Sequence, residues 1–325
     1  MDALKLFGLA ALAGTGIAAY AIRKMFRHDM ADINAALDKG GSLVELYHGL
    51  IEYGREGSGP PVLLIHGAGG GYDQGLMVGR ELFGEGHDMI APSRFGYLRS
   101  CRPADSQPHI QADAFAALLD HLQTPAAVVL GISAGAPSAI ELALRHPEHV
   151  RALILVVPRA YAPDVEVTAE RVAANRPIFE MIMKGQDFAW WAAAKVARRR
   201  LLRFLGVPTA VYDAADPLER DRLDWIVRNV LPLSRRVHGI VADGEARIEP
   251  RPLEMIKAPT LVISARDDLF NTLPAARWTA EHVPDAELMV LESGGHLLCG
   301  QGEEVRARIA EFLRRRLAPV TQRAA

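Results

Sequence analysis

The sequence predicts an α/β fold: a mostly parallel sheet flanked by helices, with an inserted helical lid and an apolar N-terminal helix. Three observations lead to this prediction. Short apolar runs alternate with segments of helical periodicity, this alternation stops between Tyr161 and Arg251, and Leu6 to Ile22 carries no charge. Strands that alternate with helices imply right-handed crossovers and parallel pairing. We therefore assign residues 1–28 to the N-terminal helix, 29–160 and 252–325 to the core, and 161–251 to the lid.

Composition narrows the class of protein. The chain has 325 residues, half of them apolar, which is enough for one large core. A formal net charge of −2 with mixed signs argues against nucleic acid as a partner. Cys101 and Cys299 are too few for a disulfide scaffold and lack the spacing of metal ligands. Because no other cluster of ligands is evident, we expect neither a metal nor another cofactor.

The uncharged run near the N-terminus is long for a soluble protein. Its 17 residues would form a helix of about 26 Å, which nearly crosses a hydrocarbon core if Lys5 and Arg23 reach toward the surfaces. Three interpretations compete: a membrane anchor, a cleaved signal peptide, and an apolar helix docked on the globular part.

The charges that flank this run favour the anchor. A signal peptide carries its positive charge in front of the apolar run, but here Asp2 offsets Lys5, and the basic residues follow within 23–27. By the positive-inside rule the rest of the chain would then lie in the cytoplasm. Cleavage at the small residues around Ala19 to Ala21 would instead give a secreted or periplasmic protein.

Apolar runs predict the strands of the core. Val62 to Ile65 is continuous, as in a strand buried on both faces of a parallel sheet. Ser42 to Tyr53 alternates roughly, which predicts one or two antiparallel strands at a sheet edge. Further strands are expected at 88–91, 126–130, 152–157, 260–264 and 288–291, and helices at 74–83, 112–122, 137–145 and 303–317.

A Gly-x-Ser-x-Gly sequence, Gly131 to Gly135, joins one of these strands directly to a helix. A serine held at such a sharp turn brings the residues two before and two after it close together, so glycine fits there. This strained turn lifts the Ser133 hydroxyl clear of the sheet edge. Ser133 is therefore the candidate nucleophile.

A serine hydroxyl needs a base within hydrogen-bond reach, and the base needs a carboxylate. Because the carboxyl ends of parallel strands share one edge, both partners can be distant in sequence. His296 follows the last predicted strand in a Gly-Gly turn and is the candidate base. The candidate acid is Asp267 or Asp268, which follow the strand at 260–264, and only one of them can bind the imidazole.

These motifs occur in a familiar order: 66–71 (His-Gly-Ala-Gly-Gly-Gly), 93–97 (Ser-Arg-Phe-Gly-Tyr), the serine turn, and then the acid and the histidine. In this the chain resembles the α/β-hydrolase fold family from about Ser42 to Leu317. The resemblance implies that fold, acyl-transfer chemistry and a lid.

The resemblance also bears on the acid. It implies that Asp268 is the acid, while Asp267 caps the turn or pairs with an arginine. Thr272 stands where the family often has proline, which is a departure from the pattern.

Backbone N–H groups are the candidates for stabilising the oxyanion. These are the amides of Ala68, in the Gly-rich turn, and Ala134, beside the serine. Gly67 to Gly71 matches neither phosphate-binding pattern, so a nucleotide site is not expected. His66 and the segment 93–97 are expected to shape the turn and the pocket floor.

The expected activity is two-step hydrolysis of a carboxylic ester, lipophilic if the N-terminal helix is an anchor. In this family haloalkane dehalogenases and epoxide hydrolases have aspartate at the position of Ser133, which argues against both. Carbon–carbon bond hydrolysis, peptidase action and perhydrolysis stay open, as does a membrane-tethered binding protein without turnover. The expected partners are a small-molecule ester or lipid and a membrane, and the sequence does not determine the oligomeric state.

Overall fold

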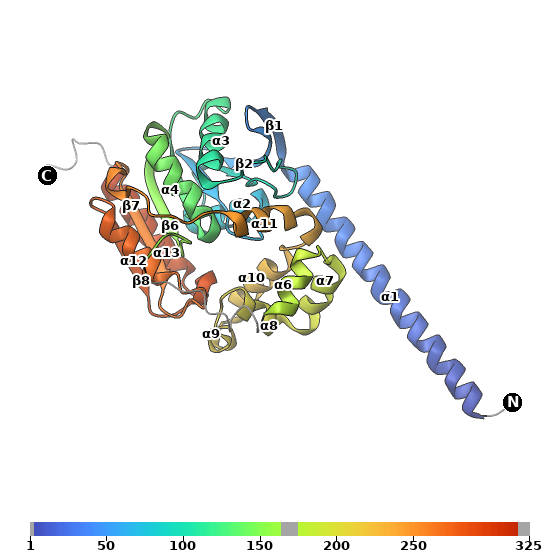
Figure 1. The fold of residues 1–325 in the computed structure, drawn as a ribbon. Helices are drawn as coiled ribbons and strands as arrows, with labels where there is room; N and C mark the ends of the chain where they lie inside the picture. The colour runs from blue at the N-terminus through green and yellow to red at the C-terminus, as the bar shows by residue number, and fades with distance from the viewer. Residues whose placement is uncertain (1–2, 164–174, 318–325) are drawn as a thin grey trace.

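The computed structural model describes residues 3–163 and 175–317, with side chains from residue 16 onward. Within these residues one eight-stranded sheet has the order β1-β2-β4-β3-β5-β6-β7-β8 (Figure 1). Strand β2 pairs antiparallel with β1 and β4, and all other neighbours are parallel. The strands are β1 Ser42–Leu46, β2 Gly49–Gly57, β3 Pro61–Ile65, β4 Asp88–Pro92, β5 Ala127–Ile132, β6 Val150–Val156, β7 Thr260–Ala265 and β8 Glu287–Leu291.

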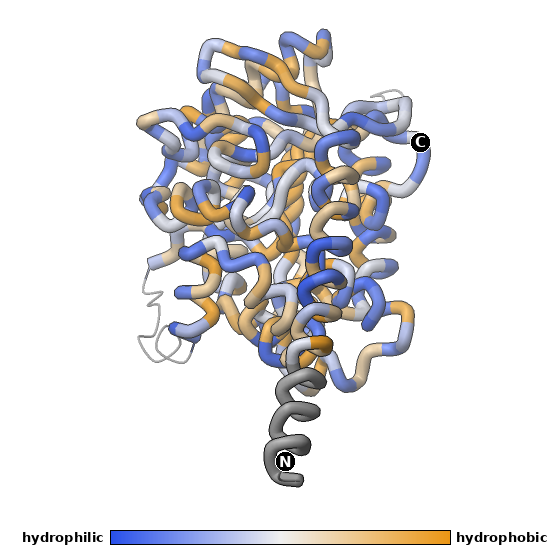
Figure 2. The backbone as a smooth tube through the Cα atoms, turned by 90° about the vertical axis from the view of Figure 1, so that its right-hand side faces the viewer, coloured by the Kyte–Doolittle hydropathy of each residue, from blue (hydrophilic) through white to orange (hydrophobic). Residues whose placement is uncertain are grey.

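Helices cover both faces of the sheet. Side chains of β3 alternate between the two cores: Leu63 and Ile65 pack on one side, Val62 and Leu64 on the other. This is why the strand reads as a continuous apolar run. Figure 2 shows the hydrophobic strands gathered in the middle of the molecule. The helices are α3 Pro108–His121, α4 Ala136–Arg145 and α12 Leu273–His282 on the first face, and α2 Tyr72–Phe83 and α13 Gly302–Leu317 on the second.

The predicted mostly parallel sheet flanked by helices is confirmed, and each predicted core strand lies within about two residues of an observed one. Helix α3 begins at Pro108, four residues before its predicted start, because proline suits the first turn. No bounds were predicted for helix α12, since its buried positions are Ala275, Ala276 and Thr279, whose small side chains give a weak periodic signal.

Six described α-helices lie between β6 and β7 in the sequence, and we refer to them as the inserted helices. They surround a third apolar cluster that includes the fully buried Trp190. Residues 164–174 of the predicted lid lie outside the described residues. The inserted helices are α6 Arg176–Met183, α7 Asp187–Val196, α8 Arg198–Phe204, α9 Thr209–Ala214, α10 Pro217–Arg228 and α11 Val237–Glu245.

Helix α1, Ala3–Gly40, runs past the boundary expected after residue 28. No glycine or proline interrupts it from 29 to 39, and Gly40-Gly41 follows. Residues 16–25 are exposed on the part of the helix that projects from the body (Figure 1). From Phe26 onward the helix packs on the inserted helices, where Asp29 accepts a hydrogen bond of 2.8 Å from the Trp191 indole.

Most of the predicted apolar run, residues 6–15, has side chains outside the described part of the chain. Within the residues described, no helix is both long enough and apolar enough to cross a bilayer.

Candidate active site

Ser133 follows β5 directly and has a φ of 48°, a left-handed conformation that is strained for a residue with a side chain. The two glycines of the motif make this turn possible. A Cβ at Gly131 would lie 2.6 Å from the Cβ of Ala139, and one at Gly135 would lie 2.5 Å from the carbonyl oxygen of His66. The turn is therefore packed against α4 on one side and against the Gly-rich turn on the other.

The structure brings Ser133, His296 and Asp268 together. The His296 Nε2 atom lies 2.8 Å from Ser133 Oγ, and its Nδ1 atom lies 2.9 Å from Asp268 Oδ2. Each residue follows a different strand, β5, β7 or β8, so the carboxyl edge of the sheet supplies all three. The imidazole is 10% exposed and the carboxylate is fully buried.

The Asp268 carboxylate is held by further donors. The backbone N–H of Phe270 donates to Oδ1 at 2.7 Å, and the Thr272 hydroxyl donates to Oδ2 at 2.5 Å. Burial acts to raise the pKa of Asp268, but attraction to His296 and these hydrogen bonds hold it below its ordinary value. The carboxylate is thus kept anionic beside the imidazole. Thr272, where the sequence departed from the family pattern, supplies one of these bonds.

Asp267 binds a different part of the same region. Its carboxylate accepts hydrogen bonds from the backbone N–H groups of Gly294 and Gly295, at 3.2 and 2.8 Å, and from the Ser293 hydroxyl at 2.8 Å. Asp267 therefore caps the turn that carries His296, and it has no hydrogen bond to the imidazole among those described.

The Gly-rich turn is oriented by its carbonyl groups. The Gly67 oxygen accepts from His66 Nδ1 at 2.7 Å and from Arg94 Nη2 at 3.1 Å. In a trans peptide the N–H of the next residue, Ala68, points in the opposite direction. A Cβ at Gly67 would lie 3.3 Å from the Ser133 Cβ, so this peptide lies beside the serine.

The peptide after the serine is fixed in the same way. The Ser133 carbonyl oxygen accepts from the backbone N–H groups of Arg159, at 3.0 Å, and Ala136. This directs the Ala134 N–H away from that carbonyl. Ala134 is 8% exposed, whereas Ala68 is exposed at the surface of its turn.

Sequence reasoning missed a buried ion pair behind the Gly-rich turn. Arg94 Nη1 and Nη2 donate to the two Asp243 oxygens at 2.5 and 2.8 Å, and the Tyr97 hydroxyl donates to Oδ2 at 2.5 Å. Burial would lower the pKa of Arg94, but Asp243 holds it above its ordinary value. Asp243 lies on α11, 149 positions away in the sequence, and no local pattern predicts the pairing.

His66 is the second buried group that orients the turn. Its Nε2 accepts the backbone N–H of Arg94 at 3.0 Å, which leaves Nδ1 to donate to the Gly67 carbonyl. Burial, together with the nearby charge of Arg94, lowers the pKa of His66 well below its ordinary value. The imidazole is therefore neutral, and its two hydrogen bonds fix the Gly67 carbonyl relative to the backbone of Arg94.

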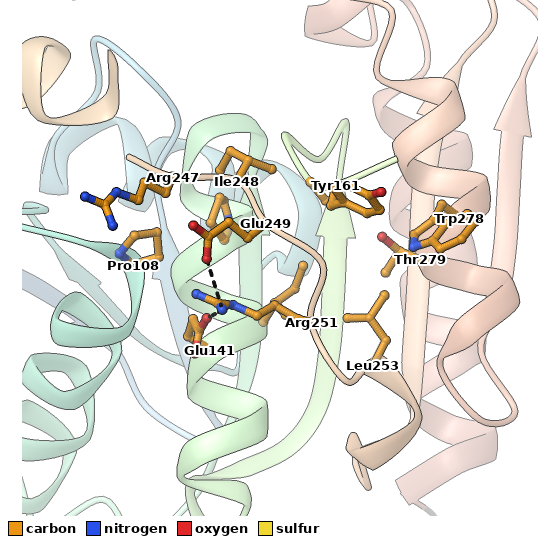
Figure 3. A pocket seen from close by; sticks show the side chains of 13 residues that line it. Pro108, Glu141, Tyr161, Arg247, Ile248, Glu249, Arg251, Leu253, Trp278 and Thr279 are labelled. Carbon is orange, nitrogen blue, oxygen red and sulfur yellow. Dashed lines mark ion pairs between the residues drawn. The ribbon is translucent and has the colours of Figure 1, made fainter. Parts of the chain in front are cut away.

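A small cavity lies on the outer side of α4 (Figure 3). Its volume of about 30 Å³ has room for a few water molecules at most. The segment that returns from α11 to β7 forms one wall, where the Arg251 side chain pairs with Glu141 at 2.5 Å and with Glu249. Tyr161 and Trp278 form the opposite wall (Figure 3). No residue of the Ser133 cluster lines this cavity, so we do not assign it to the substrate.

Within the residues that the structure describes, no group of three or more His, Cys, Asp or Glu side chains is arranged to hold an ion. At Ser133 a hydroxyl, an imidazole and a carboxylate lie in series.

A family model described as the alpha/beta hydrolase fold matches residues 60–303. The chain belongs to the α/β-hydrolase fold family. Among its relatives, the 2-hydroxymuconate semialdehyde hydrolase of Pseudomonas sp. (strain CF600) is 30% identical over 74% of this α/β-hydrolase and 81% of the relative. An uncharacterized hydrolase of Bacillus subtilis, YcgS, is 28% identical over 77% of this chain and 89% of the relative.

Solved structures agree with this assignment. An α/β-hydrolase fold protein from Nakamurella multipartita has 33% sequence identity and a TM-score of 0.61. The match covers 84% of this chain and 99% of that protein. The match therefore spans the greater part of this α/β-hydrolase.

Proposed function

We propose that this α/β-hydrolase is a serine hydrolase that cleaves carboxylic esters through an acyl-enzyme intermediate. One observation carries the proposal: a continuous series of contacts from Ser133 Oγ to His296 Nε2, at 2.8 Å, and from His296 Nδ1 to Asp268, at 2.9 Å. A hydroxyl in this setting can lose its proton to the imidazole while it attacks a carbonyl carbon.

In the first step Ser133 Oγ bonds to the ester carbonyl carbon, and His296 takes the hydroxyl proton. The negative charge that develops on the carbonyl oxygen is stabilised by the N–H groups of Ala68 and Ala134. His296 then gives its proton to the leaving alkoxide as the carbon–oxygen bond breaks. Asp268 keeps the imidazole oriented and stabilises its charged form.

In the second step water attacks the acyl group on Ser133, and His296 takes one proton from that water. Collapse of the second tetrahedral intermediate releases the carboxylic acid and returns the proton to Ser133 Oγ. The net reaction consumes one ester and one water and yields one acid and one alcohol, with no cofactor.

A fluorophosphonate probe tests this proposal, because it modifies only an activated serine. We expect the full chain to be labelled and to hydrolyse p-nitrophenyl acetate, and the Ser133→Ala and His296→Ala variants to do neither. Absence of labelling in the folded wild-type protein would instead favour a binding protein that keeps the fold without turnover. Rates across p-nitrophenyl esters of increasing chain length would then define the acyl preference.

Carbon–carbon bond hydrolysis is the second candidate. It is favoured by the 30% identity with the 2-hydroxymuconate semialdehyde hydrolase over 74% of this chain. Two substrates distinguish these activities: p-nitrophenyl acetate reports ester hydrolysis, and 2-hydroxymuconate semialdehyde reports carbon–carbon bond hydrolysis. A kcat/KM that is higher for the semialdehyde, and that is lost in Ser133→Ala, would replace the ester proposal with this one.

We also propose that α1 anchors the protein to a membrane, with the catalytic domain on the cytoplasmic side. The support is the uncharged run from Leu6 to Ile22, the basic residues after it, and the projection of that end of the helix from the body (Figure 1). Protease protection of a C-terminal tag in membrane vesicles tests the orientation. Digestion of the tag from the outside face would overturn it.

A further inference from the structure

The loop that carries His296 is bonded to the inserted helices as well as to the sheet. We call residues 294–300, which follow β8, the histidine loop. Three hydrogen bonds join its backbone to the inserted segment: His296 N–H to the Gly206 carbonyl at 3.0 Å, Arg222 Nη2 to the Leu297 carbonyl at 2.8 Å, and Gly300 N–H to Glu219 Oε1 at 3.0 Å. Two of these bonds use side chains of α10, and the third uses the turn between α8 and α9.

The Gly206 carbonyl has a second partner in the active site. The backbone N–H of Leu269, the residue after Asp268, donates to the same oxygen at 3.2 Å. A carbonyl oxygen has two lone pairs and can accept both bonds. One atom of the inserted segment therefore joins the loop of the base to the loop of the acid.

This contact requires glycine on both sides. Gly206 has a φ of 90°, and a Cβ there would overlap the Cβ of His296 and the ring of Phe270. Gly295 has a φ of 61°, and a Cβ there would lie 2.9 Å from the Gly206 oxygen. The inserted segment thus approaches the histidine loop backbone to backbone, in a conformation that other residues rarely adopt.

The nucleophile is held differently. Ser133 lies between β5 and α4, and its carbonyl accepts from Arg159, which follows β6. Its described backbone contacts are with the core, whereas His296 and Leu269 are bonded to the inserted segment. A displacement of the inserted helices would therefore act directly on the base and the acid. It would reach the serine only indirectly, through Arg159, whose side chain donates to the Asp243 carbonyl of α11.

We propose that the inserted helices keep Asp268 and His296 aligned with Ser133. The site can then carry out its chemistry only while these helices are packed against the core. Gly206 and Arg222 are the positioning residues. This inference rests on the proposed serine hydrolase activity and adds a mode of regulation: undocking the helices switches off the chemistry as well as changing access to the site.

Two pairs of variants of the full chain test the proposal. Gly206→Ala is compared with Gly86→Ala, since Gly86 has a similar φ of 86° but open space where its Cβ would lie. Arg222→Ala is compared with Arg220→Ala, because the Arg220 side chain bonds the Asp213 carbonyl within the inserted segment. Near-UV circular dichroism identifies the variants that keep the folded structure.

Two quantities are measured: the steady-state kinetics of hydrolysis of a small ester, p-nitrophenyl acetate, and the rate of fluorophosphonate labelling. We expect Gly206→Ala and Arg222→Ala to lower kcat and the labelling rate by about a hundredfold with KM unchanged, the scale of a 1 Å displacement of a catalytic group. Both controls should keep the wild-type kcat. A residue that only governs access would instead slow long-chain esters and leave labelling by the small probe intact.

Hydrogen exchange on the wild-type protein gives a second test that does not depend on how a variant folds. We expect backbone amides in segments 201–208, 266–272 and 293–300 to become exchangeable together as urea is raised. Exchange of 201–208 while the other two segments stay protected would overturn the inference.

The outcomes also separate this inference from the proposed function. If the two variants are labelled at the wild-type rate while Ser133→Ala is not labelled, the positioning role is wrong and the hydrolase stands. If the folded wild-type protein is not labelled at all, the hydrolase proposal itself fails.

Discussion

Asp267 and Asp268 are neighbours in the chain, yet their carboxylates bind different groups of the histidine loop. Asp268 accepts from the His296 ring at 2.9 Å, whereas Asp267 accepts from the N–H groups of Gly294 and Gly295. One residue therefore acts on the imidazole and the other on the backbone that carries it. Variants of the two residues therefore separate the effect of the charge on the imidazole from the effect of the bonds that hold the loop backbone.

Asp268→Asn should mainly lower kcat, whereas Asp267→Asn should mainly lower the free energy of unfolding. Replacing Asp268 removes the charge that orients the imidazole, and we expect kcat for p-nitrophenyl acetate to fall by about ten-thousandfold. Replacing Asp267 weakens charge-assisted bonds to the turn, and we expect a loss of about 1–3 kcal/mol of unfolding free energy with a smaller loss of kcat. Steady-state kinetics and urea unfolding distinguish the two, and a larger loss of kcat in Asp267→Asn would reverse the assignment.

Thr272→Val should make Asp268 easier to protonate. The Thr272 hydroxyl donates to the Asp268 oxygen that also faces His296, and it is one of the groups that lower the pKa of this carboxyl. A lowered folded-state pKa contributes stability above the unfolded value of about 3.8 and loses it as the pH falls through the folded value. Without the hydroxyl this contribution shrinks.

Urea unfolding between about pH 3 and 7 measures this effect. We expect the wild-type protein to be more stable than Thr272→Val near neutral pH, and the difference to diminish toward the acid end. Thr272→Ser is the matched control, because it keeps the hydroxyl. A difference that is the same at every pH would mean that the lost contact between the Thr272 and Ser264 hydroxyls, and not the bond to Asp268, is responsible.

His66→Gln should alter the pH dependence of folding near neutrality. The pKa of His66 lies well below 6.5 in the folded state because the ring is buried. Below about pH 6.5 the unfolded chain binds a proton that the folded protein does not, so stability falls as pH decreases, by up to about 1.4 kcal/mol per pH unit. The variant keeps the other histidines and lacks this one, so its stability should fall less between pH 7 and 5. Equal slopes would show that His66 is not the titrating group.

The sequence predicted the features that depend on local pattern or chain order. Ser133 was recognised from a strand, a turn and a helix in immediate succession, and His296 from its place after the last strand. Asp268 needed the family resemblance, because nothing local separates it from Asp267. Chain order sufficed here because parallel strands bring their carboxyl ends to one edge.

Contacts between distant segments were not predictable in this way. The bond between the His296 N–H and the Gly206 carbonyl joins segments 90 positions apart. Every residue has a backbone carbonyl, so the sequence does not indicate which one accepts this bond. Helix α1 passed its expected boundary because residues 26–38 find partners on the inserted helices and on the core, such as Trp191 for Asp29 and Tyr72 for Leu37. Such partners become known only when the chain is folded.

The last prediction concerns the Arg94–Asp243 pair, which links helix α11 to the Gly-rich turn. Asp243→Asn leaves a buried guanidinium with reduced compensation, and we expect a loss of about 3–5 kcal/mol of unfolding free energy. Arg94 also holds the Gly67 carbonyl, so the Ala68 N–H should lose its alignment and kcat for p-nitrophenyl acetate should fall by about a hundredfold.

The double variant Arg94→Met/Asp243→Leu separates stability from catalysis at this pair. Removing both charges avoids an unpaired buried ion, so we expect it to recover much of the unfolding free energy that Asp243→Asn loses. It does not restore the Arg94 bond to the Gly67 carbonyl at 3.1 Å, so kcat should stay low. Recovery of kcat together with stability would show that the pair supports the fold alone, and that His66 suffices to orient the peptide before Ala68.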